Sequence, residues 1–213
     1  ANNEIGIDAT NLDAANTTGG GIFITDSATG LTLTDLGGPD ANAVSGGGGG
    51  GAIIASSPLT ISGDAITTGG MTYTATDSGV GDDLTVTNNA TVQDDTALTL
   101  NAGDNLDLQV GTTVQVTGGT LTLNLDAGDN DGAGEVANLF GILDAAGATI
   151  ALNAGADGYT INIDSNGAAA GGTVENIQDD LLYTSTTSVD TINLEDSGDA
   201  SADTTVAITD GGP

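Results

Sequence analysis

The chain has 213 residues, of which 30 are acidic, and it contains no Lys, Arg, His or Cys, so its formal net charge is −30 at pH 7. This charge argues against nucleic acid as a partner, because phosphate binding depends on Lys and Arg, and no apolar run is long enough for membrane insertion. Without His, Lys, Arg or Cys the usual general bases and activated nucleophiles are missing, so we predict that the chain is not an enzyme.

The apolar residues favour a thin, elongated core. Hydrophobic residues make up 38% of the chain, but only two Phe and three Tyr are present and Trp is absent. A compact globule normally fills its centre with large rings, whereas stacked Val, Ile, Leu and Ala can fill a narrow coil. We therefore expect one continuous all-β domain over residues 1–213, a length that undivided all-β domains often reach.

Residues 1–45 contain apolar residues spaced two apart between clusters of Gly and Asn, which predicts short strands from the first residues onward. The pairs are Ile5 and Ile7, Ile22 and Ile24, and Leu31 and Leu33. Asn16 lies in a formal glycosylation sequon, as does Asn89 further along, but such sequons arise by chance in a chain rich in Asn and Thr.

Six consecutive glycines occupy residues 46–51 and form the strongest candidate for a boundary within the chain. A flexible linker is one interpretation, because Gly-rich segments have little conformational preference. A loop that bulges from one coil is the other, since the same rhythm of strands and turns resumes after Ile53 and Ile54.

The segment Leu84–Leu125 shows the strand pattern most clearly, with alternating apolar and polar residues between turns rich in Asn, Asp and Gly. The tetrapeptide LTLN begins at Leu98 and again at Leu121, and a related IALN begins at Ile150. A spacing of this size predicts a solenoid, in which each repeat is one coil that buries its apolar side against its neighbours.

The most apolar run, Val136–Leu152, fits either an amphipathic helix or buried strands. Gly141 and Gly147 lie inside the run, and alternation continues beyond it, so we expect strands with a turn at Asp144–Gly147. Three more strand and turn units follow from Ile150 to the C-terminus.

The acidic loop between residues 126 and 135 is the main candidate site, and its carboxylates are Asp126, Asp129, Asp131 and Glu135. Ca²⁺ prefers six to eight oxygen ligands, and a short loop rich in Gly and Asp can bring several of them together. With no cationic side chain in the chain, clustered carboxylates can be neutralised only by protons or metal ions. A solvated acidic loop without an ion is the alternative, because acidic turns are common.

Two other segments are similar to the calcium-binding nonapeptide repeat, although neither copy is complete and they are not in tandem. Asp83 and Asp157 occupy its Asp position, which makes them weaker candidate ligands. Adjacent carboxylates at Asp82–Asp83, Asp94–Asp95 and Asp179–Asp180 could in principle serve a glycosidase, but neighbours in a turn are usually solvated.

The strand and turn pattern, LTLNAGDNLDLQVGTTVQVTGGTLTLNLDAGDNDGAG followed by ILDAAGATIALNAGADGYTINI, resembles the repetitive passenger regions of large bacterial surface proteins of the filamentous-haemagglutinin and autotransporter-adhesin kind. The resemblance lies in the style of the repeat and covers most of the chain. It implies a right-handed parallel β-helix that is secreted and serves adhesion, a biofilm matrix or a surface coat without catalysis.

We therefore predict a parallel β-helix, or β-solenoid, that acts as a structural or adhesive segment at the cell surface or in the extracellular space. Expected partners are other copies or neighbouring repeats, polysaccharide, and cations such as Ca²⁺. The lack of an initiating Met and of a signal peptide favours a segment of a larger protein. The alternative is a β-sandwich, pilin-like subunit that forms filaments by donor-strand exchange through its N-terminal run NNEIGIDATNLD.

Overall fold

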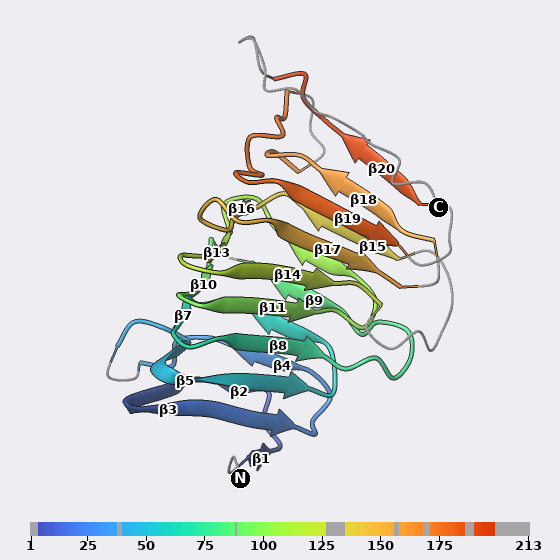
Figure 1. The fold of residues 1–213 in the computed structure, drawn as a ribbon. Helices are drawn as coiled ribbons and strands as arrows, with labels where there is room; N and C mark the ends of the chain where they lie inside the picture. The colour runs from blue at the N-terminus through green and yellow to red at the C-terminus, as the bar shows by residue number, and fades with distance from the viewer. Residues whose placement is uncertain are drawn as a thin grey trace.

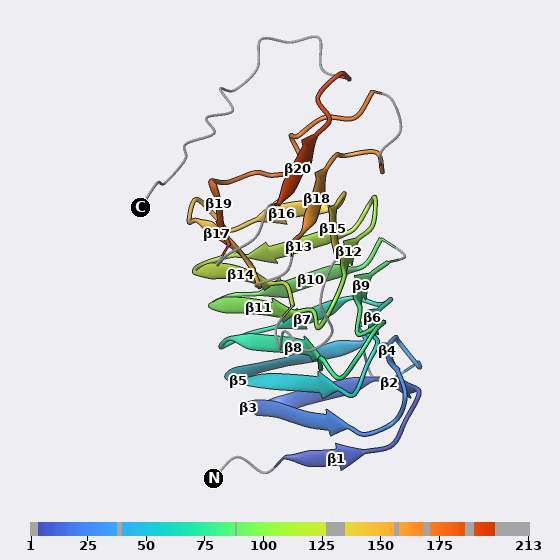
Figure 2. The ribbon, with the colours of Figure 1, turned by 90° about the vertical axis from the view of Figure 1, so that its right-hand side faces the viewer.

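A computed structural model describes residues 4–37, 40–87, 89–126, 135–155, 158–167, 171–185 and 190–198. In these residues the chain is all-β, and its strands wind into a parallel β-solenoid of about six turns (Figure 1). Figure 2 shows the turns stacked one above another from the N-terminal end, so the body is elongated as the composition predicts. The part of the chain that the structure describes has no helix long and apolar enough to cross a membrane.

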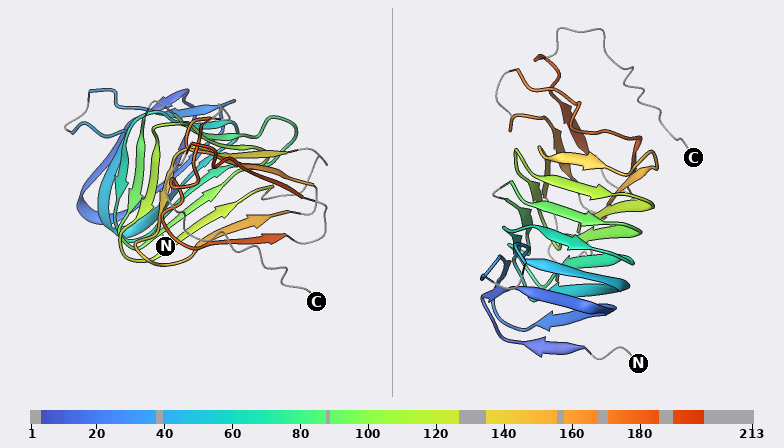
Figure 3. Two further views of the ribbon diagram at one scale, coloured as in Figure 1. Left: turned by 90° about the horizontal axis from the view of Figure 1, so that it is seen from above. Right: turned by 90° about the vertical axis from the view of Figure 1, so that its left-hand side faces the viewer.

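The solenoid has three faces. Face one consists of β1 (Ile5–Ile7), the second halves of β3 (Ala14–Asp26) and β5 (Val44–Ala55), β8 (Met71–Ala75), β11 (Ala97–Asn101), β14 (Thr120–Asn124), β17 (Ile150–Ala154) and β19 (Leu181–Ser185). Face two consists of β2 (Asn11–Leu12), β4 (Leu31–Leu33), β6 (Leu59–Ile61), β9 (Leu84–Val86), β12 (Leu106–Leu108), β15 (Val136–Leu139), β18 (Thr160–Ile163) and β20 (Thr191–Leu194). Face three consists of the first halves of β3 and β5, with β7 (Ala65–Thr67), β10 (Thr91–Asp94), β13 (Thr113–Val116) and β16 (Ile142–Asp144). Figure 3 shows this stack from above and from the side opposite to Figure 2.

The repeated tetrapeptides stack directly on one another. Leu98 of β11 pairs with Leu121 of β14, and Leu121 pairs with Ile150 of β17, so LTLN, LTLN and IALN occupy the same place in three successive turns. The solenoid predicted from the sequence is confirmed, and the repeated tetrapeptides pair in register. Turn lengths differ because the connecting loops differ: Asn101 and Asn124 in adjacent turns are 23 residues apart, whereas Asn162 and Asn193 are 31 apart.

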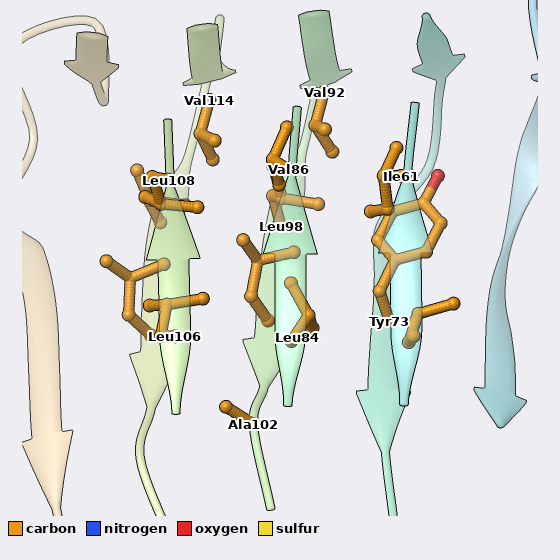
Figure 4. Packing of buried hydrophobic residues seen from close by; sticks show 14 of the residues in the cluster. Ile61, Tyr73, Leu84, Val86, Val92, Leu98, Ala102, Leu106, Leu108 and Val114 are labelled. Atoms are coloured by element: carbon orange, nitrogen blue, oxygen red, sulfur yellow. The ribbon is translucent and has the colours of Figure 1, made fainter. Parts of the chain in front are cut away.

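The core is a column of aliphatic side chains between the faces. Alternate residues of each strand point inward, and Leu84, Leu98, Leu106 and Leu108 are all fully buried (Figure 4). Tyr73 is the large ring among the labelled side chains of Figure 4, and it is fully buried as well. Two inward aliphatic side chains from each of strands β9, β11 and β12 are buried in this narrow coil, which explains why a chain poor in aromatic residues can fold this way.

The six glycines at 46–51, predicted as a linker or a bulging loop, instead lie inside strand β5. Val44 at one end of β5 pairs with β7 on face three, and Ile53 at the other end pairs with β8 on face one. The glycines therefore carry the chain around the corner between these two faces. A Cβ atom on Gly49 would lie 2.5 Å from the backbone carbon of Gly20 in β3, so close packing between adjacent turns requires glycine there.

The β-sandwich alternative is contradicted, because the described strand pairings are parallel and belong to one solenoid. The N-terminal run is not a free donor strand, since β1 pairs with β3 and β2 pairs with β4 of the same chain. The run from Val136 to Leu152 is confirmed as strands, with a turn that places Ala146 and Gly147 at positive φ.

Candidate functional site

Buried carboxylates gather where the chain passes from face one to face two. We call this edge the acidic corner and define it by Asp26, Asp82, Asp104, Asp126 and Glu135. Each of the five side chains is at most 8% exposed. Five buried acids along one edge of a chain without a cationic side chain must be stabilised by hydrogen bonds, protons or bound cations.

Backbone amides supply part of that stabilisation. The Asp104 carboxylate accepts hydrogen bonds from the amides of Gly81 and Asp82, the latter at 2.9 Å. Asp82 accepts hydrogen bonds from the amides of Ser78 and Gly79, the latter at 2.9 Å. Burial opposes ionisation of Asp82, but hydrogen bonds, including these two, hold the pKa of its carboxyl below its usual range. Asp104 also links adjacent turns, because its amide donors belong to the preceding loop.

The predicted calcium ligands are divided between described and undescribed parts of the chain. Asp126 and Glu135 are buried in the acidic corner at the two ends of the predicted loop. Asp129 and Asp131 lie outside the described residues. A Cβ atom on Gly155 would lie 2.2 Å from the Asp126 carboxylate, so this carboxylate packs directly against the next turn. Within the described ranges no three acidic side chains are grouped closely enough to hold a metal ion, and the calcium site stays a prediction.

Of the two candidate ligands in the nonapeptide-like segments, the structure describes only one. Asp83 lies beside the acidic corner, where its Oδ1 accepts hydrogen bonds from the backbone amide of Asn105 at 3.3 Å and from its side-chain Nδ2 at 2.7 Å. Asp157 lies outside the described residues. Asp83 therefore joins the loops of two successive turns through Asn105, a structural role that needs no ion.

Asp94 occupies the corner between face three and face one and is fully buried. Its Oδ1 accepts hydrogen bonds from the amides of Gly70, Thr96 and Ala97 at 3.0, 2.8 and 3.1 Å, and Thr67 donates its hydroxyl to Oδ2 at 2.8 Å. The expectation of a solvated turn is wrong for Asp94. Its strand ends at an inward position, where the carboxylate meets the amides that the turn leaves without strand partners.

The other adjacent carboxylate pairs also close turns. Asp95 accepts a hydrogen bond from the amide of Gly69 at 2.7 Å, and this bond is the main cause of its lowered pKa. Asp179 accepts hydrogen bonds from the amides of Ala145 and Gly147 at 2.6 and 2.9 Å. These contacts give the carboxylates a role in chain geometry.

A ladder of asparagines runs along the outside of face one. Asn124 donates a hydrogen bond to Oδ1 of Asn101 at 2.8 Å, and Asn153 donates to Oδ1 of Asn124 at 2.8 Å. Asn101 in turn donates to the hydroxyl of Thr74 at 3.0 Å. The LTLN repeat contains the signal for this ladder, but sequence reasoning used the repeat only to predict the solenoid and gave its polar residues no further role.

A second ladder runs along the outside of face two. Asn193 donates to Asn162 at 2.9 Å, Asn162 donates to Asn138 at 2.8 Å, and Asn138 donates to the carboxylate of Asp107 at 3.2 Å. Beyond Asp107 the same column continues with Thr85 of the preceding turn. Both ladders repeat one hydrogen bond per turn along the solenoid axis.

Comparisons with known proteins found no matching family model, no similar curated protein and no similar solved structure.

Proposed function

We propose that this chain is a non-catalytic structural or adhesive segment of an extracellular bacterial surface or matrix protein. The observation that supports this proposal is the repetition of outward side chains in columns along the solenoid axis, of which the ladder from Asn101 to Asn153 is the clearest. In an enzyme, a few functional groups usually converge in one pocket. A column of equivalent groups instead offers many weak contacts along a line, which suits adhesion to a repetitive partner.

The charge of the chain fits a surface or matrix location. Thirty carboxylates without one cationic side chain repel one another, and spreading them along a rod reduces that repulsion in saline surroundings. Cations that bind at the loop between residues 126 and 135 would reduce it further, and Ca²⁺ is the cation that such oxygen ligands prefer. In this proposal cations stabilise the rod and help copies to associate into fibres.

Adsorption and scattering measurements test the adhesive role. The purified chain, in the presence and absence of millimolar CaCl2, is passed over surfaces coated with neutral or acidic polysaccharide, and its size is followed by small-angle X-ray scattering. We expect adsorption to at least one polysaccharide surface, or an increase in particle length with CaCl2. A monomer that adsorbs to none of the surfaces and does not lengthen contradicts the proposal.

A turnover assay tests the non-catalytic part separately. Incubation with polyuronides and neutral β-glucans should release no reducing ends or unsaturated products above those in a buffer control. Release that scales with protein concentration and disappears on heat denaturation would establish an enzyme instead.

A further inference from the structure

Face one presents a two-column array of side chains outside the solenoid. We call it the outer array and define it by eight outward residues of β8, β11, β14 and β17: Thr72, Thr74, Thr99, Asn101, Thr122, Asn124, Ala151 and Asn153. Strand pairing spaces the rows about 4.8 Å apart, and alternation along each strand spaces the columns about 6.6 Å apart. The array is therefore a small, nearly rectangular lattice.

The side chains of the outer array are held in place. Threonine is β-branched, so its χ1 angle is restricted and its methyl and hydroxyl groups keep defined directions. The amides of Asn101, Asn124 and Asn153 are aligned by hydrogen bonds of 2.8 Å between successive turns. Each ladder amide uses one N–H in this way and carries a second N–H that can meet a ligand in a fixed orientation.

The outer array is uncharged although the chain carries 30 acidic residues. The outward positions of β8, β11, β14 and β17 are occupied by Thr, Asn and Ala, including Ala97 and Thr120 at the edge of the array. A neutral face does not attract cations or basic proteins, and it has no carboxylates through which cations could join it to a second copy of this chain. The partner of this face is therefore expected to be neutral and periodic.

We propose that the outer array binds the surface of ice. On the prism faces of hexagonal ice, oxygen atoms repeat in two perpendicular directions, with a shorter repeat close to the row spacing of the array and a longer repeat somewhat wider than its column spacing. Hydroxyl and amide groups of the array can therefore take the places of surface water molecules in the lattice. Thr72, Thr99 and Thr122 form one column beside the asparagine column, and their methyl groups favour release of less ordered water. Crystalline polysaccharide is the other neutral periodic partner, but the eight residues of the array include no aromatic ring on which a sugar ring could stack, and Phe23 lies two turns beyond them in the Thr72 column.

Thermal hysteresis and partition into a slowly growing ice hemisphere test the proposal on the full chain. We expect the wild-type protein to lower the freezing point below the melting point, to shape ice crystals and to enter the ice fraction. Thr99→Tyr places a large ring in the middle of the array and should reduce both activities severalfold, and Thr122→Tyr one row away should do the same. Circular dichroism and the melting temperature verify that each variant is folded.

The matched control is Thr85→Tyr, which makes the same change in the middle of a face-two strand. This variant should keep wild-type ice activity. The proposal is overturned if the wild-type protein is excluded from ice, or if folded Thr99→Tyr and Thr85→Tyr lose activity equally. Binding to microcrystalline cellulose or chitin without partition into ice would overturn it in favour of a polysaccharide partner. Adhesion to soluble polysaccharide would leave the structural or adhesive role standing even if ice binding failed.

Discussion

At the scale of one residue, individual Asp carboxylates determine the conformation of several turns. Asp82, Asp94 and Asp104 each accept at least two hydrogen bonds from backbone amides, so each organises a turn that has no regular secondary structure. Hydrogen bonds to a charged acceptor contribute more to stability than those to a neutral one. The abundance of Asp thus serves the turns of the solenoid as well as its surface charge.

Replacement of Asp82 by Asn tests this role through its pH dependence. The pKa of Asp82 is lower in the folded chain than its usual value, so its ionised form stabilises the fold above about pH 4 and this contribution is lost as the pH falls through the folded pKa. Asp82→Asn should therefore lower the free energy of unfolding by about 1 to 2 kcal/mol at pH 7. Urea unfolding from pH 7 to pH 3 should show the difference from wild type shrinking below about pH 4. Asp180→Asn, at an exposed position, removes the same charge and should have little effect. A difference that stays constant down to pH 3 would contradict this explanation.

At the scale of one element, the corner between face three and face one depends on how strand β5 packs. Strand β5 passes around this corner through glycines that lie against the backbone of β3. A flexible linker would tolerate alanine at these positions, whereas a packed corner would not.

Gly49→Ala distinguishes these two cases. Its Cβ would lie 2.5 Å from backbone atoms of Gly20 and Gly21, which cannot move without disturbing β3, so we expect the free energy of unfolding to fall by at least about 2 kcal/mol. Gly6→Ala is the matched control, because a Cβ there meets nothing within 4 Å, and its effect should stay within about 0.5 kcal/mol. Chemical denaturation of both variants provides the measurement, and equal stability of the two would restore the linker interpretation.

At the scale of the whole molecule, repulsion among the carboxylates opposes the stability of the stacked turns. We expect the melting temperature to rise with NaCl, because salt screens the repulsion among 30 carboxylates. Millimolar CaCl2 should raise it further than NaCl of equal ionic strength, because a bound ion adds its binding free energy to that of folding.

The double variant Asp129→Asn with Asp131→Asn should lose most of the additional calcium effect if the predicted loop is the site. Asp107→Asn with Asp144→Asn removes the same charge from outward strand positions and should retain it. If the loop variant responds to calcium as wild type does, the ion binds elsewhere, and a wild-type chain that responds only to ionic strength has no calcium site.

The sequence was sufficient to predict the fold where one physical rule acted alone. Alternation placed Leu98, Leu100, Leu121 and Leu123 on the buried side, and the repeated LTLN predicted that they stack in successive turns, as they do. The same rules failed at Gly49, because composition cannot distinguish a flexible glycine from one packed against a neighbouring backbone. They also failed at Asp94, whose buried carboxylate meets the Gly70 amide and the Thr67 hydroxyl of the preceding turn as well as amides of its own turn. The ladders were missed because alternation assigns a residue to the outside without indicating which residues it meets there.

The near identity of stacked rows has a consequence for how the chain reaches its native state. If Leu121 and Leu123 took the level of Leu98 and Leu100 during folding, face one would gain the same aliphatic contacts, and Asn124 could donate to Thr74 as Asn101 does in the correct arrangement. Discrimination between the two arrangements then depends on the unequal loop lengths and on distinctive side chains such as the buried ring of Tyr73. Refolding should therefore be slow and should pass through compact species that are shifted by one turn, and these must unwind before the native order of rows can form.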